Sequence, residues 1–260
     1  MKKFLLAGII ISALLCSCKK DKGIDYASLI PGTWVNTQVD SKTILTDASF
    51  VLKFHGGNME TFASGVILDE NNKTWMENDS YTYSVDGNRI IIDGNNNLGS
   101  NFHLEFIIQS VDQQTLTYSV SKFMVDGVEY PDPKIYTNKK VTVSLSSQFV
   151  GTWYGKSTTQ GNPDSSYHYW QYFADGHFNY YYQDNSGNWI NKPDNNGLYF
   201  LYGSLLATNY TNDLITGGTG KVFQCRNISI QGNTMFWMCL RENSLVTSVR
   251  MEKVTGPPVI

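Results

Sequence analysis

Gly32-Thr33-Trp34, near the start of the chain, recurs as Gly151-Thr152-Trp153 at an offset of 119 residues. Phe54-His55-Gly56-Gly57 recurs at the same offset as Phe173-Ala174-Asp175-Gly176. Landmarks that return in one order at a nearly constant spacing indicate a duplication, because self-similarity at a fixed period is the sequence mark of repeated structural units. The chain of 260 residues is therefore predicted to contain two similar domains in tandem.

Each half is predicted to consist of short strands joined by tight turns. In the second half, the aromatic run 167–173 indicates a strand, Ala174-Asp175-Gly176 indicates a hairpin turn, and 177–182 indicates the returning strand. Strands at this spacing are typical of sandwiches and barrels, and sequential hairpins favour an up-and-down meander that closes on itself. We therefore predict an all-β protein with two antiparallel barrels, at residues 29–145 and 149–255.

The Gly-x-Trp opening of each half, the meander and a basic residue in the last strand resemble the lipocalin family. More closely, the arrangement resembles tandem lipocalin-like domain lipoproteins of the Bacteroidetes type. The resemblance implies that the opening Trp packs across the closed end of its barrel, beneath a basic side chain whose charge is attracted to the indole face. The barrel-closing sets implied are Trp34 under Lys139 or Lys140, and Trp153 under Arg250 or Lys253.

The first residues are typical of a bacterial lipoprotein precursor. Met1-Lys2-Lys3 is a positive segment, and the apolar run 4–15 that follows is shorter than the roughly 20 residues that a membrane-spanning helix needs. Leu15-Cys16-Ser17-Cys18 resembles a lipobox. Cys18 is preferred over Cys16 as the lipidated residue, because the small Ser17 suits cleavage better than Leu15.

These features predict a signal peptide at 1–17 and a lipidated tether at 18–28. We expect a palmitate-bearing anchor that attaches the protein to a membrane of the cell envelope, the outer membrane being preferred, with its periplasmic or outward orientation left open. The formal net charge of −3 argues against nucleic acid as a partner, since nucleic acid selects for basic faces.

Signatures of catalysis are absent from the sequence. There is no Gly-x-Ser-x-Gly, no phosphate-binding loop and no His-Glu-x-x-His. The four histidines are not spaced as a metal cluster, so neither an enzyme nor a metal site nor a cofactor is expected.

The aromatic hairpin of the second half is the most suggestive binding feature. Aromatic residues occupy both faces of its two strands, which exceeds what one core face requires. The candidate ligand-contacting residues are Tyr167, Tyr169, Trp170, Tyr172, Tyr180 and Tyr182. Packing in the core and against the other domain is the alternative use of these side chains.

Cys225 and Cys239 flank a predicted hairpin around 231–233. A three-residue loop would set the two cysteines opposite each other, whereas a two-residue loop would put them on opposite faces. The envelope permits disulfides, so a bond and two free thiols both stay open at this point.

The resemblance implies non-catalytic binding of a small apolar or amphipathic ligand inside a barrel. One alternative is a surface module that binds a glycan or a protein through exposed Tyr and Trp. Another is a structural envelope lipoprotein whose barrels are filled by side chains, since eight-stranded barrels occur in both forms. A cavity of at least about 300 Å³ would favour the first hypothesis.

Overall fold

The structure is a computed structural model that describes residues 23–44, 49–63, 79–95, 99–159, 162–163, 166–191, 196–210, 223–240 and 246–260. The predicted signal peptide, Cys16 and Cys18 lie outside these residues. None of the helices that the described ranges contain has the length and apolar character to cross a membrane.

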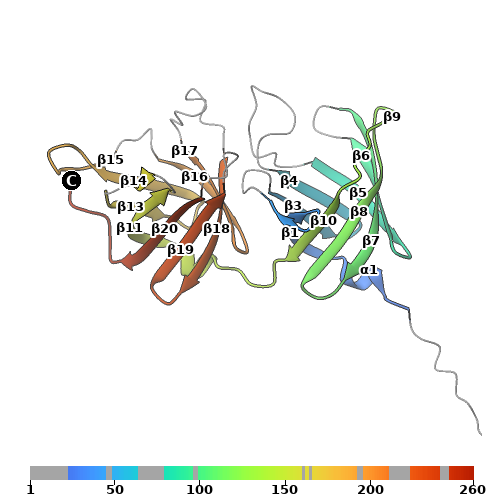
Figure 1. Cartoon of the computed structure of the whole chain (residues 1–260), viewed down its shortest axis with the longest axis horizontal. Helices are drawn as coiled ribbons and strands as arrows, with labels where there is room; N and C mark the ends of the chain where they lie inside the picture. The colour runs from blue at the N-terminus through green and yellow to red at the C-terminus, as the bar shows by residue number, and fades with distance from the viewer. Residues whose placement is uncertain are drawn as a thin grey trace, which may run out of the picture.

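The first half forms a closed eight-stranded antiparallel barrel, here called barrel 1 (Figure 1). Its strands follow one another around the barrel, and β10 closes it by pairing with both β1 and β8. The strands are β1 (Gly32–Val39), β3 (Phe50–His55), β4 (Asn58–Ala63), β5 (Asp79–Asp86), β6 (Arg89–Asn95), β7 (Asn101–Val111), β8 (Thr115–Val125) and β10 (Ile135–Lys140). Two short strands, β2 (Lys42–Thr43) and β9 (Val128–Glu129), extend β1 and β8.

The second half repeats this plan as barrel 2, which β20 closes by pairing with β11 and β19. Its strands are β11 (Gly151–Thr159), β13 (His168–Tyr172), β14 (His177–Gln183), β16 (Gly197–Tyr202), β17 (Leu205–Tyr210), β18 (Phe223–Gln231), β19 (Thr234–Leu240) and β20 (Val246–Val254). The short β12 (Asn162–Pro163) and β15 (Trp189–Asn191) pair with β11 and β14. The predicted fold class, all-β with two tandem up-and-down barrels, is confirmed.

A one-turn helix, α1 (Tyr26–Leu29), precedes the first strand and covers one end of barrel 1. Trp34 is fully buried beneath it and donates its indole N–H to the carbonyl oxygen of Ile30 at 2.8 Å. The Lys140 ammonium lies 4.9 Å from the Trp34 ring centroid and donates to the carbonyl oxygen of Leu29 at 3.0 Å. The indole and the ammonium therefore satisfy carbonyl groups that the end of a short helix leaves without partners.

Barrel 2 has the same closed end. The helix α2 (Ser146–Phe149) precedes β11, and the Trp153 indole donates to the carbonyl oxygen of Phe149 at 2.7 Å. The Lys253 ammonium lies 5.2 Å from the Trp153 ring centroid and donates to the carbonyl oxygen of Gln148 at 2.6 Å. The two copies thus close one end by the same three contacts.

The glycine of each Gly-x-Trp opening is required by this arrangement. Gly32 and Gly151 both have φ of 134°, a backbone conformation that L side chains rarely adopt. A Cβ at Gly32 would lie 2.5 Å from Cε of Lys140, and a Cβ at Gly151 would lie 2.7 Å from Cε of Lys253. The glycine therefore leaves room for the lysine that crosses the tryptophan.

The two copies differ by one residue in the hairpin that follows the opening strand. Gly32 pairs with Phe54, whereas Gly151 pairs with Tyr172 rather than Phe173. The connection from the opening strand to the next long strand is one residue shorter in barrel 2, which shifts the alignment, and the hairpin loop that follows is one residue longer, which restores it. The sequence match of Phe54 with Phe173 is therefore corrected: Tyr172 takes the core position of Phe54.

The two barrels lie side by side and share an apolar contact (Figure 1). Its buried residues come from the outer faces of β1 and β3 in barrel 1 and of β17 in barrel 2. They are Val35, Val51, Leu205 and Ala207, with Val141, Phe200 and Tyr202 packed against them. The outer strand faces of the two barrels pack against each other through this contact.

Candidate functional site: a cavity in barrel 1

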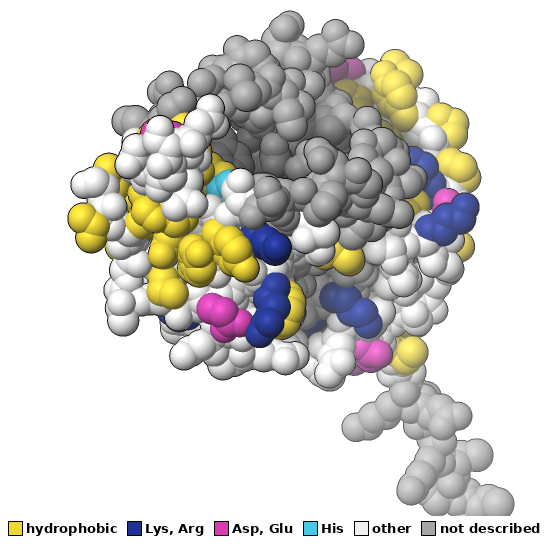
Figure 2. Space-filling view, turned by 60° about the vertical axis from the view of Figure 1, so that its left-hand side comes forward, with side chains coloured by type: hydrophobic (Ala, Val, Ile, Leu, Met, Phe, Trp, Pro, Cys, Tyr) yellow, Lys and Arg dark blue, Asp and Glu magenta, His cyan; other side chains and the backbone are white. Residues whose placement is uncertain are grey.

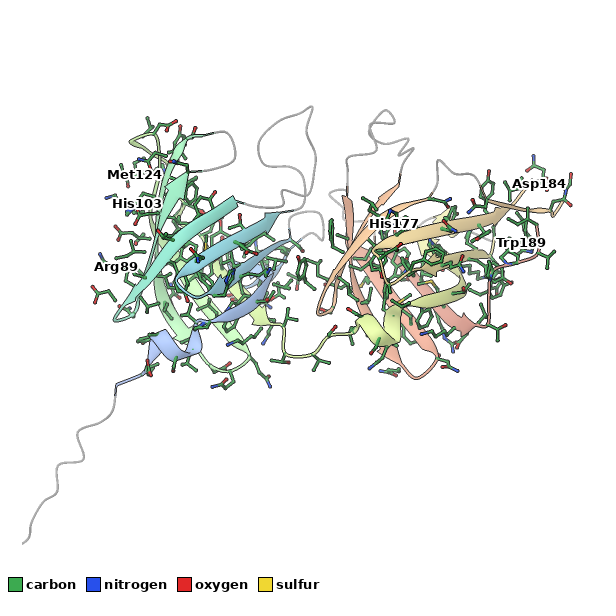
Figure 3. The ribbon with its side chains drawn as sticks, turned by 180° about the vertical axis from the view of Figure 1, so that it is seen from behind. Arg89, His103, Met124, His177, Asp184 and Trp189 are labelled. Atoms are coloured by element: carbon green, nitrogen blue, oxygen red, sulfur yellow. The ribbon has the colours of Figure 1, made fainter. Side chains whose placement is uncertain are left out.

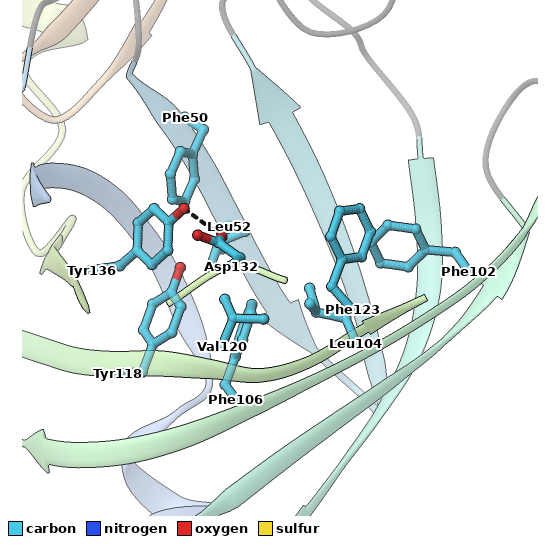
Figure 4. Close-up of a pocket in the computed structure, with 10 residues that line it drawn as sticks. All are labelled: Phe50, Leu52, Phe102, Leu104, Phe106, Tyr118, Val120, Phe123, Asp132 and Tyr136. Atoms are coloured by element: carbon cyan, nitrogen blue, oxygen red, sulfur yellow. Dashed lines mark hydrogen bonds between the residues drawn. The ribbon is translucent and has the colours of Figure 1, made fainter. Parts of the chain in front are cut away.

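A cavity of about 180 Å³ lies inside barrel 1 (Figure 4). Nine of its lining residues are apolar or aromatic and project from β3, β7, β8 and β10, and the tenth comes from the segment between β9 and β10. The lining consists of Phe50, Leu52, Phe102, Leu104, Phe106, Tyr118, Val120, Phe123, Asp132 and Tyr136. Ligand sites in proteins share this composition, an apolar wall with few polar groups.

The polar groups of the cavity gather at one corner. The Tyr136 hydroxyl donates a hydrogen bond to Oδ2 of Asp132 at 2.6 Å. In Figure 4 the hydroxyl end of Tyr118 is turned toward the same corner, while Phe102 and Phe123 lie at the other end. The cavity is therefore amphipathic, with one carboxylate and two hydroxyl groups at one end and hydrocarbon at the other.

Burial and the neighbouring carboxylate keep both tyrosines protonated. Burial raises the pKa of Tyr118 well above its ordinary value. Burial also raises the pKa of Tyr136, and the hydrogen bond to Asp132 raises it further. Each effect disfavours the phenolate. Both side chains thus keep their hydroxyl protons at neutral pH.

A pair of buried amides lies between this cavity and the closed end of barrel 1. Asn36 and Asn138 face each other across β1 and β10, and Nδ2 of Asn36 donates to Oδ1 of Asn138 at 2.9 Å. Both side chains are buried, and neither Oδ1 of Asn36 nor Nδ2 of Asn138 has a hydrogen-bond partner among the described residues. The interior of barrel 1 is therefore polar at this level, which lies two residues along β10 from Tyr136.

The interior of barrel 2 is filled at the corresponding place. Trp170 occupies the position of Leu52, because each pairs directly with the closing tryptophan of its barrel. Arg226 is buried, donates to Oγ1 of Thr208, and lies 4.8 Å from the ring centroid of Trp237. The larger side chains occupy the space that barrel 1 leaves open.

The predicted ligand-contacting residues fall into two groups. Trp170 and Tyr172 belong to the packed core of barrel 2, and Tyr180 packs against that core with its hydroxyl 2.8 Å from Nδ1 of His168. Tyr182 stacks near Tyr180, with 6.0 Å between ring centroids. Trp170, Tyr172 and Tyr180 thus pack in the interior of barrel 2, and contact of this group with a ligand stays a prediction.

Tyr167 and Tyr169 lie on the outer face instead, in a cluster that Tyr154 and Trp189 complete. The rings pack on one another: Tyr154 stacks on Tyr167 at 5.0 Å, and Trp189 meets Tyr169 edge-on at 4.8 Å. Figure 2 shows hydrophobic side chains gathered on the side where barrel 2 comes forward, next to basic side chains. Tyr167, with 43% exposure, offers the most accessible ring of this cluster.

Two wider depressions lie on the outer surface of barrel 2. One, of about 540 Å³, is lined by the outward-facing Phe236, Met238 and Arg250 together with small polar residues. The other, of about 590 Å³, runs beside α2 and β16. Both are lined largely by surface residues of the barrel wall, and the charged residue in their linings is Arg250, whereas the barrel 1 cavity has Asp132.

Arg250 is not a barrel-closing residue, which corrects one of the two expectations for barrel 2. Its guanidinium carbon lies 5.8 Å from the Phe236 ring centroid on the outer face. Side chains alternate along β20, so Met251 and Lys253 point inward and Arg250 points outward. Lys139 is likewise exposed and donates to Thr115, while Lys140 covers Trp34.

The backbone register of the last hairpin bears on Cys225 and Cys239. Gln231 pairs with Thr234 across a two-residue turn, and Asn227 pairs with Met238. This is the shorter of the two loops considered for this hairpin. The side chains of Cys225 and Cys239 lie outside the described part of the chain, so a bond and two free thiols both stay open.

The histidines form no metal site within the described residues. The best-connected one is His103 on the outer face of barrel 1 (Figure 3), with Nδ1 2.7 Å from Asp93 and Nε2 3.1 Å from Glu105. The hydrogen bond to Asp93 raises the pKa of His103, and the bond to Glu105 adds to this effect. Arg89 also binds Glu105, at 3.2 Å.

No protein-family model matches the chain, and no curated protein matches it. The likeness to lipocalins rests on the two closed eight-stranded barrels, which are consistent with a lipocalin-like fold, and on the Gly-x-Trp openings.

Proposed function

We propose that this protein is a non-catalytic binding protein of the cell envelope and that its first barrel takes up a small amphipathic molecule. The observation that carries the proposal is the cavity of about 180 Å³ lined by aromatic and aliphatic side chains of barrel 1. Eight-stranded barrels are wide enough either to be filled by side chains or to hold one small ligand. Among the described residues, large side chains pack the core of barrel 2, whereas barrel 1 has the cavity.

The volume limits the ligand to a small molecule. The cavity is smaller than the roughly 300 Å³ at which typical ligand pockets begin. Apolar cavities of about 150 Å³ nevertheless bind benzene. The ligand that fits is therefore a single ring, or a short chain, with a small polar group, and a long acyl chain is too large.

Binding can be tested with benzyl alcohol, a single ring that carries one hydroxyl group. Isothermal titration of the purified protein is expected to show one site. Leu52→Trp introduces at the cavity wall the residue that fills barrel 2, so it should abolish binding. The matched control is Leu198→Trp, which adds the same side chain at a position that is 40% exposed on barrel 2. Equal binding by both variants would contradict the proposal.

We further propose that Cys18 carries the lipid that holds the protein to the membrane. The support is the sequence pattern at 15–18 that follows the short apolar segment. Labelling of cells with an alkyne-bearing palmitate should mark the wild type and Cys16→Ala, whereas Cys18→Ala should lose both the label and the membrane fractionation. Loss of label in Cys16→Ala alone would place the lipid on the other cysteine.

A further inference from the structure

The cavity of barrel 1 contains one carboxylate that has no described cationic partner. Asp132 accepts a hydrogen bond from Tyr136 through Oδ2, and no lysine, arginine or histidine in the described part of the chain forms an ion pair with it. A carboxylate at an apolar wall is costly unless a positive charge or several hydrogen bonds compensate it. One tyrosine hydroxyl supplies part of that compensation.

Aromatic rings surround the same corner. Phe50 meets Tyr136 edge-on with 5.8 Å between ring centroids, Tyr118 stacks on Tyr136 at 5.4 Å, and Phe106 lies 4.1 Å from Tyr118. The faces of aromatic rings carry negative potential, and together they attract a cation that enters between them. The carboxylate and the rings therefore favour the same sign of charge in a ligand.

We propose that the barrel 1 cavity selects a small organic cation, a protonated primary amine on a compact apolar body, with its ammonium group beside Asp132. The inference rests on the proposed function, because it assigns a ligand class to the same cavity. The ammonium would donate to the carboxylate, and the apolar body would lie toward Phe102, Leu104 and Phe123.

Other ligand classes fit the corner less well. An anion would be repelled by Asp132 in a setting where charges interact more strongly than in water. A neutral alcohol could donate one hydrogen bond but would leave the charge uncompensated. A metal ion would need several ligating groups, and the described residues hold no cluster that could bind one. Because both tyrosines stay protonated, Asp132 provides the negative charge of the cavity.

Three probes of the same size and different charge test the inference: benzylamine, benzyl alcohol and benzoate. Isothermal titration of the purified protein at pH 7.5 should show benzylamine binding at least about tenfold more tightly than benzyl alcohol, and benzoate most weakly. Asp132→Asn keeps the shape of the side chain and removes its charge. It should lower benzylamine affinity by about tenfold or more and leave benzyl alcohol affinity within about threefold.

Asp86→Asn is the matched control, because it removes one carboxylate charge from an exposed position of barrel 1 that does not line the cavity. This variant should retain the preference for benzylamine. Equal affinities for benzylamine and benzyl alcohol in the wild type would overturn the amine inference and leave the proposed function standing. Binding of none of the three probes would overturn both. The wild-type ratio decides the question even if Asp132→Asn does not fold.

Discussion

Barrel 1 and barrel 2 share a frame and differ in what occupies its centre. Both begin with a one-turn helix, a glycine in an unusual conformation and a buried tryptophan covered by a lysine. On the wall above that end, Leu52 in barrel 1 corresponds to Trp170 in barrel 2. Closure and interior are thus separate properties of the fold, and the same closed end supports a hollow barrel or a filled one.

Further positions follow the same contrast. Tyr118 pairs with Tyr136 in barrel 1, and Trp237 takes the place of Tyr118 in barrel 2, where Val249 is its partner. Ile108 pairs with Tyr118, and Ile228 pairs with Trp237. Two residues before these isoleucines, barrel 1 has Phe106 and barrel 2 has Arg226. Leu52, Tyr118 and Phe106 are thus smaller or shorter than their counterparts in barrel 2, whereas Tyr136 is larger than its counterpart Val249.

The part of the interior between the buried tryptophan of the closed end and the level of the cavity differs in polarity between the two barrels. Barrel 1 has the hydrogen-bonded pair Asn36 and Asn138, and barrel 2 has Gly155 and Met251 at the same register positions. A Cβ at Gly155 would meet the Arg250 carbonyl oxygen and the Met251 side chain, so the glycine makes room for the methionine. Barrel 2 therefore gains apolar packing where barrel 1 keeps two buried amides.

The largest expected effect tests whether the closed ends are equivalent. Trp34→Ala and Trp153→Ala should each lower the free energy of unfolding by about 3–5 kcal/mol, because each removes a fully buried indole and its hydrogen bond to the helix. Chemical denaturation measures the loss. Tyr167→Ala, at an exposed ring, is the control and should cost less than about 1 kcal/mol. A small loss for one tryptophan only would show that the two ends are not equivalent.

Converting the filled barrel into a hollow one should have the next largest effect. Trp170→Leu copies the barrel 1 residue and should lower the free energy of unfolding by about 2–4 kcal/mol, because a large core side chain is truncated. It should also open a second cavity, so titration with benzyl alcohol should change from one site to two. An unchanged stoichiometry would mean that neighbouring side chains collapse into the space.

The buried amides allow an intermediate test. Asn138→Met copies barrel 2 and removes the side-chain partner of Asn36, so it should cost about 1–3 kcal/mol in the free energy of unfolding. Met251→Leu, at the matching site of barrel 2, conserves volume and should cost less than about 1.5 kcal/mol. A gain in stability for Asn138→Met would indicate that the two unpartnered amide atoms already cost more than the pair contributes.

The smallest effect concerns His103, which has no counterpart in barrel 2. Its pKa in the folded protein is raised above the ordinary value of 6.5, so the stabilisation is complete below about pH 6.5 and is lost as the pH rises through the folded pKa. Thermal unfolding of His103→Gln should therefore differ from that of the wild type most at pH 5.5 and least at pH 8.5, by less than about 1 kcal/mol because the pair is near the surface. A difference that grows with pH would contradict the assignment.

The repeat was sufficient to predict the architecture, since a recurring Gly-Thr-Trp and hairpin turns fix where each barrel begins and how its strands follow one another. The covering lysine was reduced to two candidates per barrel, and strand alternation decided between them. The location of the cavity was not predicted. The richness of the second half in Tyr and Trp favoured that half for binding, whereas in the structure much of that aromatic content fills barrel 2.

A signal for the cavity was nevertheless present in the sequence. Once the two halves are aligned strand by strand, Leu52 stands against Trp170 and Tyr118 against Trp237. At each of these positions the side chain of barrel 1 is the smaller one, and the difference in volume marks where space remains. The connection before this strand is one residue shorter in barrel 2, and this obscured the alignment because the constant offset of 119 residues set Phe54 against Phe173 instead of Tyr172.

The orientation of the closed ends has a consequence for the route by which a ligand reaches the cavity. Both one-turn helices lie on the same side of the molecule, from which the described chain begins at residue 23 (Figure 3). The shared apolar contact joins the barrels through their walls, so the two closed ends face one way together. An anchor at Cys18 would turn these plugged ends toward the bilayer. The cavity of barrel 1 would then exchange its ligand with the surrounding water and not with the lipid.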